Sequence, residues 1–138
     1  MALKWSEQLS VGNDLIDADH KYLIEIVNQV EQGMRANDQS ELTAALNSLV
    51  QYSKIHFPRE EKIASAVGYK RVSNLHDSHE ALIVKLGQIR EEIEQGWTAA
   101  SEEHFSTMLR EWLINHIIKE DLLMKPLLTK FSPSFVSG

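Results

Sequence analysis

The sequence predicts an all-α protein whose helices form an up-down-up-down four-helix bundle with an N-terminal arm. The chain has 138 residues, which is the size of one domain with a single substantial core. Apolar residues recur at helical spacing in four long stretches, and almost no segment alternates with the period of two that is typical of a strand. Because the connections between these stretches are short, successive helices should be antiparallel neighbours.

The first two helices are expected to follow the N-terminal arm. Asp14 and Asp17 are candidate N-caps of the first, and Asp38 or Ser40 of the second, which should run from about Ser40 to Ala66. The inward stripe of the first helix consists of Ile16, His20, Leu23, Val27, Val30 and Met34. The inward stripe of the second consists of Leu46, Leu49, Ser53, His56, Glu60 and Ile63.

The third helix should begin near Ser73 and end at Gly96, because glycine is favoured just after a helix C-terminus. The fourth is expected to begin near Ser101 and to end around Pro126. The inward stripe of the third helix consists of Leu75, His79, Leu82, Leu86, Ile89 and Ile93. That of the fourth consists of Phe105, Leu109, Trp112, His116 and Leu123.

The two ends of the chain fall outside the helical pattern. Residues 1–13, with Trp5 and Val11, are expected to form an ordered arm over the bundle, because an isolated exposed Trp would be unusual. The bundle domain is expected to span residues 1–130. Residues 131–138 have no periodicity and are predicted to be a loose C-terminal tail.

Composition and charge exclude several classes of function. The formal net charge is -6 with both signs interspersed, which argues against nucleic acid or an anionic membrane surface as the main partner. The absence of cysteine excludes disulfides, thiolate zinc sites and Cys nucleophiles. No apolar signal region and no run of about 18 apolar residues is present, so the expected location is the cytoplasm.

Polar residues interrupt the inward stripe of every predicted helix. The interruptions are His20 in the first helix, His56 and Glu60 in the second, His79 in the third and His116 in the fourth. Burying each of these groups without compensation would cost roughly 2 to 7 kcal/mol. A divalent metal would compensate, because neutral imidazoles coordinate it and a carboxylate can bridge two ions. The pattern therefore predicts a metal site inside the bundle.

Spacing along the helices adds detail to this prediction. His56 and Glu60 are four residues apart, so both project from one face of the second helix toward one metal cluster. His116 and Asp121 are five apart, which on an ideal helix is about 140° of rotation. Asp121 must therefore reach across, or the fourth helix must carry a local π-like widening.

Taken together, the chain from Trp5 to about Leu128 resembles the hemerythrins, and in particular the single-domain bacterial hemerythrins. The segments that carry the resemblance are Trp5, residues 16–20, residues 56–61, Gly68 with Tyr69, His79 and residues 112–121. The resemblance implies two iron ions bridged by Glu60, Asp121 and an oxo or hydroxo group. His20 and His56 would serve the iron that leaves a position open for dioxygen. His79 and His116 would serve the other iron, alongside a third histidine.

The third histidine is where this sequence departs from the family pattern, His-x-x-x-His in the third helix. If Glu60 and Tyr69 fix the alignment, the missing ligand falls at Leu75, and His79 remains a ligand. In the alternative register His76 and Glu80 take the two positions, but the apolar stripe that continues from His79 favours the first register. His76 either contributes to the site from the first turn of the helix or faces solvent.

The favoured function is reversible dioxygen binding for storage, delivery or sensing, without enzymatic activity as the primary task. A di-iron enzyme acting on peroxide or nitric oxide is the first alternative, and an iron- or oxygen-responsive signalling module is the second. Histidine and carboxylate ligands also suit manganese and zinc, so the ligand types alone do not select a metal. The prediction of iron therefore rests on the resemblance.

Overall fold

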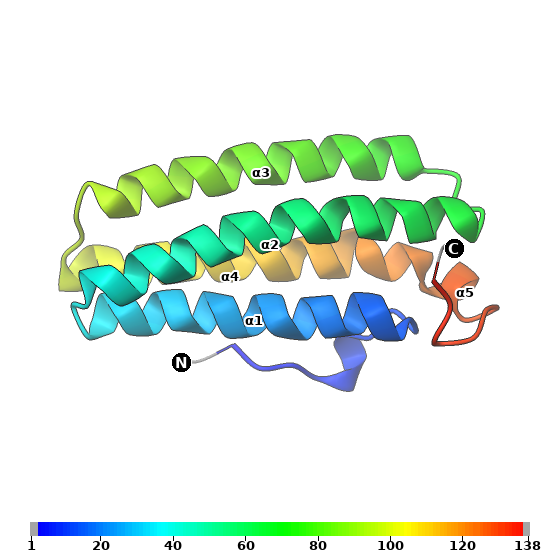
Figure 1. The fold of residues 1–138 in the computed structure, drawn as a ribbon, viewed down its shortest axis with the longest axis horizontal. Coiled ribbons are helices and arrows are strands. Elements are labelled where there is room, and N and C mark those ends of the chain that lie inside the picture. Colours follow the sequence, from blue (N-terminus) through cyan, green and yellow to red (C-terminus); the bar gives the residue numbers. More distant parts are fainter. Residues whose placement is uncertain (1–2, 137–138) are drawn as a thin grey trace.

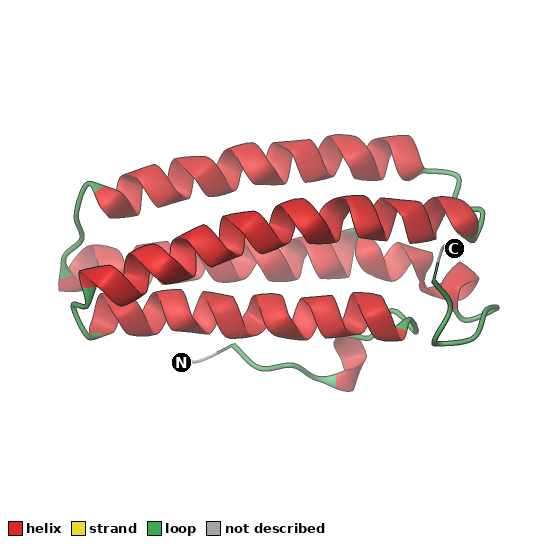
Figure 2. Ribbon diagram, viewed as in Figure 1, coloured by secondary structure: helices red, strands yellow, loops and turns green. Residues whose placement is uncertain are grey.

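The computed structural model describes residues 3–136 and is a four-helix bundle (Figure 1). Its long helices are α1 (Asp14–Arg35), α2 (Gln39–Ala66), α3 (Val72–Glu94) and α4 (Ala99–Lys119). Three short elements flank them: η1 (Glu7–Leu9), η2 (Asp121–Met124) and α5 (Lys125–Leu128). The long helices lie side by side and are joined by short loops at alternate ends (Figure 2). The predicted all-α, up-down-up-down architecture is confirmed.

The N-terminal cap of α1 differs from the prediction. The side chain of Asn13 accepts a hydrogen bond from the Ile16 amide, so neither Asp14 nor Asp17 is the cap. Asp17 instead holds the arm, because its carboxylate accepts hydrogen bonds from the Ser10 hydroxyl and from the amide of Val11. The three neighbouring polar residues could not be ranked from the sequence, since each is a favoured cap residue.

The other predicted helix boundaries agree closely with the structure, except at the end of α4. Asp38 caps α2, and Thr98 and Ser101 form a reciprocal capping box at the start of α4. Gly96, with φ 121°, follows the last residues of α3, as predicted. The prediction that the fourth helix continues to about Pro126 is wrong. α4 ends at Lys119, Glu120 leaves the helical conformation, and the chain tightens into η2.

The apolar core is divided into two clusters. The main cluster fills most of the bundle and includes Leu23, Val27, Leu46, Leu49, Leu86, Ile89, Leu109 and Ile117. The end cluster lies nearer one end of the helices and consists of Val11, Ile16, Ile63, Ala64, Val67, Leu75, Met124 and Leu128. Along α1 the order is Ile16, His20, Leu23, and along α3 it is Leu75, His79, Leu86. The buried histidines of the inward stripes, with Glu60 and Asp121, therefore form a polar layer between the two clusters.

The described parts of both terminal segments pack against α1. Residues 3–13 of the arm are ordered as predicted, because the backbone of Leu3 exchanges two hydrogen bonds of 2.9 Å with the Asn28 side chain; residues 1–2 lie outside the described residues. The described part of the C-terminal tail, which was expected to be loose, covers the start of α1. The carbonyl of Pro133 accepts from the Asp14 amide at 2.7 Å, and the carbonyl of Phe135 accepts from the Asn13 side chain at 2.8 Å. Within residues 3–136, no helix is both long and apolar enough to cross a membrane.

Candidate metal centre

Six of the seven predicted site residues meet in the polar layer. α1 contributes one imidazole, α2 an imidazole and a carboxylate, α3 and α4 one imidazole each, and η2 a carboxylate. They are His20, His56, Glu60, His79, His116 and Asp121. All six are buried: Glu60 and Asp121 are 0% exposed, and the most accessible, His116, is 6% exposed. The end of α4 at Lys119 explains how Asp121 reaches this layer, because η2 re-aims the chain without a π-like widening.

The six side chains form two overlapping groups that share both carboxylates. The first half of the centre contains His20 and His56, and the second half contains His79 and His116. Oε2 of Glu60 lies 3.0 Å from Nε2 of His56 in the first half, while its Oε1 lies 3.1 Å from Nε2 of His79 in the second.

Asp121 is divided between the halves in the same way. Its Oδ2 lies 3.1 Å from Nε2 of His20, and its Oδ1 lies 3.0 Å from Nε2 of His116. Each carboxylate therefore presents one oxygen to each half, which is the arrangement of a ligand that bridges two ions.

Hydrogen bonds between the outer ring nitrogens and nearby carboxylates orient three of the imidazoles. Nδ1 of His56 lies 2.9 Å from Asp19, Nδ1 of His79 lies 2.7 Å from Glu61, and Nδ1 of His116 bonds Glu120. A carboxylate accepts a hydrogen bond, so Nδ1 carries a proton, and whenever the ring is neutral the lone pair of Nε2 faces the centre. The Nε2 atoms of His79 and His116 are 3.1 Å apart, so their lone pairs would repel without a cation or extra protons between them.

The donor geometry fits a metal better than hydrogen bonding. Nε2 of His56 and both oxygens of Asp121 are buried and have no hydrogen-bond partner of adequate angle, although neighbouring donors lie within 3.1 Å. Bonds of about 2.1 Å to an octahedral ion give adjacent ligand atoms separated by about 3.0 Å. The observed spacings of 3.0 to 3.1 Å are compatible with this value, and the buried atoms without hydrogen-bond partners favour a metal.

The charges of the metal-free centre favour protonated imidazoles. Burial opposes protonation of His20, but the neighbouring carboxylates of Asp121 and Glu60 outweigh it and raise its pKa to about 9. Burial likewise opposes protonation of His116, whose pKa is nevertheless raised by the charge of Asp121. Burial disfavours the Glu60 anion, yet the charge of His56 and hydrogen bonds from several imidazoles hold the Glu60 pKa well below its usual value. Metal binding would replace these protons.

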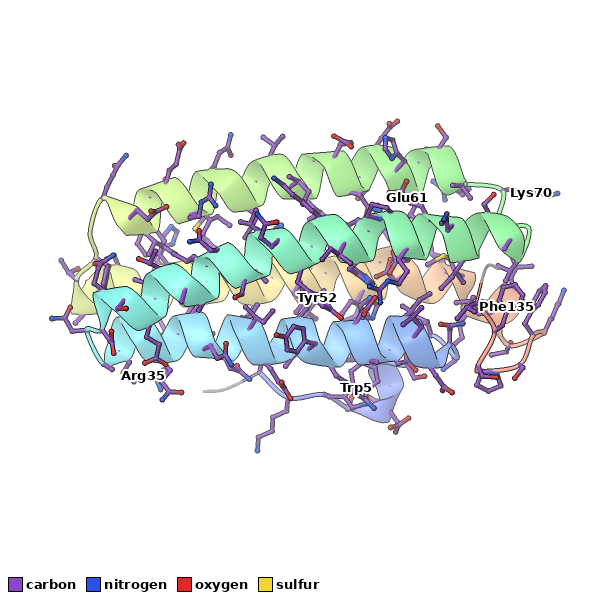
Figure 3. The ribbon with its side chains drawn as sticks, in the orientation of Figure 1. Trp5, Arg35, Tyr52, Glu61, Lys70 and Phe135 are labelled. Carbon is purple, nitrogen blue, oxygen red and sulfur yellow. The ribbon has the colours of Figure 1, made fainter. Side chains whose placement is uncertain are left out.

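The carboxylates that orient the imidazoles were missed by the sequence reasoning. Asp19 accepts hydrogen bonds from the Tyr52 hydroxyl at 2.5 Å and from Arg59 at 3.2 Å, besides its contact with His56. Figure 3 shows Tyr52 on the side of α2 that faces α1, and Glu61 beside α3. Glu120 could have been found, because it lies four residues after His116. His20 differs from the others, since its Nδ1 is buried without a partner among the described residues.

The seventh predicted residue, His76, lies outside the two groups. It is exposed, and its Nδ1 lies 2.8 Å from Glu61, the same carboxylate that contacts His79. Leu75 is 3% exposed within the end cluster, one turn before His79. The position at which the sequence predicts the third histidine to be missing thus holds a buried apolar side chain that offers no donor.

Aromatic rings wall the main-cluster side of the centre. The Phe57 ring stacks on His79 with centroids 4.1 Å apart and an interplanar angle of 8°. It also contacts the rings of His56, His116 and Trp112. This packing restrains three of the imidazoles.

These features define a metal-binding four-helix bundle with a paired histidine and carboxylate site. A family model described as the Hemerythrin HHE cation binding domain matches residues 11–128. The chain therefore belongs to the hemerythrin family.

Relatives and solved structures agree with this assignment. A bacteriohemerythrin of Stenotrophomonas maltophilia is 29% identical over 119 residues, covering 86% of this chain and 76% of that protein. A bacteriohemerythrin of Methylococcus capsulatus is 26% identical over 113 residues, covering 82% of this chain and 86% of that protein. A crystal structure of wild-type hemerythrin superposes with a TM-score of 0.79 at 24% identity, covers 94% of this chain and 99% of that one, and has the same fold.

Proposed function

We propose that the centre holds two iron ions and that the protein binds dioxygen reversibly at this pair. The observation that carries the proposal is that Glu60 and Asp121 each present one oxygen to each half of the centre. In this proposal His20 and His56 hold one ion, His79 and His116 hold the other, and both carboxylates bridge. Two imidazoles with a carboxylate and open positions form a donor set that suits non-haem ferrous iron.

The charge of the donor set favours carriage over oxidative catalysis. Four neutral imidazoles and only two carboxylates leave net positive charge on a pair of divalent ions, whereas carboxylate-rich bundle sites stabilise higher oxidation states. A ferrous pair held by these residues would supply the electrons that dioxygen binding requires. The chain contributes buried, oriented imidazoles, and the Phe57 ring stacks on one of them, His79. The proposal includes a cytoplasmic location and no nucleic-acid partner.

Absorption spectra test this function directly. The protein is loaded with ferrous iron under argon, exposed to air, and returned to argon while the spectrum is recorded. We expect an absorption band that appears with air and disappears under argon, together with two irons per chain by metal analysis. The variant Glu60→Ala is the control and should show no such band. Irreversible bleaching or a band that survives argon would refute reversible binding.

A second candidate function is an enzyme that acts on peroxide or nitric oxide. The observation that favours it is the apolar residue Leu75. Compared with a site that has a third histidine at this position, the ion held by His79 and His116 has one protein donor fewer and one more exchangeable position. Turnover of hydrogen peroxide by the iron-loaded protein tests this candidate. Multiple turnovers that Leu75→His suppresses would support the enzyme, and single-turnover bleaching would exclude it.

A further inference from the structure

The two halves of the centre differ in how deeply the groups that orient their ligands are buried. Asp19, which orients His56 in the first half, is 2% exposed and is itself held by Tyr52 and Arg59. His20 has no carboxylate partner, but it is 1% exposed, and its ring packs edge-on against His56 with centroids 4.9 Å apart. The groups in direct contact with the ligands of the first half are therefore almost fully buried.

The second half depends on carboxylates that are open to water. Glu61, which orients His79, is 19% exposed, and Glu120, which orients His116, is 34% exposed. Glu61 also divides its two oxygens between His79 and the exposed His76. A carboxylate that is hydrated and shared restrains its imidazole less than a buried one does.

Surface clefts also reach the second half. A cleft of about 470 Å³ is lined by His116 and Glu120, and one of about 310 Å³ is lined by His79, Glu61 and His76. A third, of about 280 Å³, is lined by Leu75 and Glu120. His20 and His56 line none of these three clefts. Water and competing ligands therefore approach the centre from the side of α3 and α4.

We infer that the second half of the centre is the exchangeable half: its ion, held by His79 and His116, binds last and leaves first, while the ion of His20 and His56 stays. Because Leu75 supplies no donor, this ion has two imidazoles and the shared carboxylates as its protein ligands. The inference rests on the proposed pair of ions. The occupancy of the second position therefore varies with the supply of metal, and the chain passes through a one-ion state when metal is scarce.

Metal release measured on the intact chain tests the inference. Metal-free protein is loaded with two equivalents of Co²⁺, and a chelator in excess is added while the Co²⁺ absorption is followed. We expect two phases of equal amplitude, a fast one for the ion of the second half and a slow one for the ion of the first half, because partners outside the ligand set tune metal affinity. With one equivalent of Zn²⁺, the imidazole resonances of His20 and His56 should shift first in a proton–nitrogen correlation spectrum.

Three variants assign the phases to the halves. Glu61→Gln and Glu120→Gln should accelerate the fast phase several-fold and leave the slow phase unchanged. The matched variant Asp19→Asn should accelerate the slow phase, and circular dichroism checks that all three remain helical. Release of both ions in one phase, or acceleration of the fast phase by Asp19→Asn alone, would overturn the inference. A parent chain that binds fewer than two Co²⁺ would instead refute the proposed metal pair.

Discussion

Replacing Leu75 with histidine should have opposite effects on the metal-free and metal-loaded proteins. Leu75 is 3% exposed in the end cluster, so an imidazole there loses apolar contacts and is buried without a partner. Without metal we expect a loss of about 3 kcal/mol of unfolding free energy, within the range for large core changes. At about 3 °C per kcal/mol for a chain of this length, the melting temperature should fall by roughly 10 °C.

With metal bound, the new imidazole lies one helical turn before His79 and gains a partner, so most of this loss should be recovered. Differential scanning calorimetry on both forms of the parent and of Leu75→His measures the difference. Leu128→His is the matched control: Leu128 is 1% exposed in the same cluster, and the control should be destabilised equally with and without metal. An equal loss in both forms of Leu75→His would refute the placement of Leu75 beside the second ion.

Three further outcomes follow from the centre. In metal-free protein the raised folded pKa of His20, about 9, contributes stability that is complete below pH 6.5 and lost as pH rises toward 9. Thermal melts across this window should therefore show a falling midpoint, and a rising one would contradict the assignment. Glu60→Ala should reduce bound metal from two ions to one or none by elemental analysis, because one side chain serves both halves; two ions retained would disprove bridging. His76→Ala should keep both ions, since His76 is exposed and contacts Glu61 instead; loss of one ion would make His76 a ligand.

The bundle was predictable because the apolar spacing and the residues typical of helix ends indicate the same helices. Apolar spacing located all four helices, and Asp38 and Gly96 marked two of the ends. The end of α4 was not predictable, because Leu123 continues the helical stripe on paper although Glu120 leaves the helical conformation. The apolar spacing of the sequence does not show this change of backbone conformation. The change is favoured by a tertiary contact, because it places Asp121 in the polar layer.

The polar residues of the inward stripes were predictable as site residues, because burying them without a partner costs free energy and a metal would compensate for this cost. The residues that orient them were not, because Asp19, Glu61 and Glu120 lie off the stripe and look like ordinary surface acids in the sequence. Their roles depend on contacts between helices that spacing along one helix does not encode. The ligand role of His76 stays a prediction, for which the structure supplies an alternative partner in Glu61.

The division of the core by a polar layer has a consequence for the lifetime of the protein. The end cluster, with Ile63 and Met124, is small, and in the metal-free state it is joined to the main cluster across a layer of charge. It should therefore open as a separate local unit, while the far half of the bundle stays closed around the Arg110–Glu31 ion pair. Opening exposes the chain between α2 and α3 to proteases, so metal supply would set the amount of protein that survives as well as the fraction that is active.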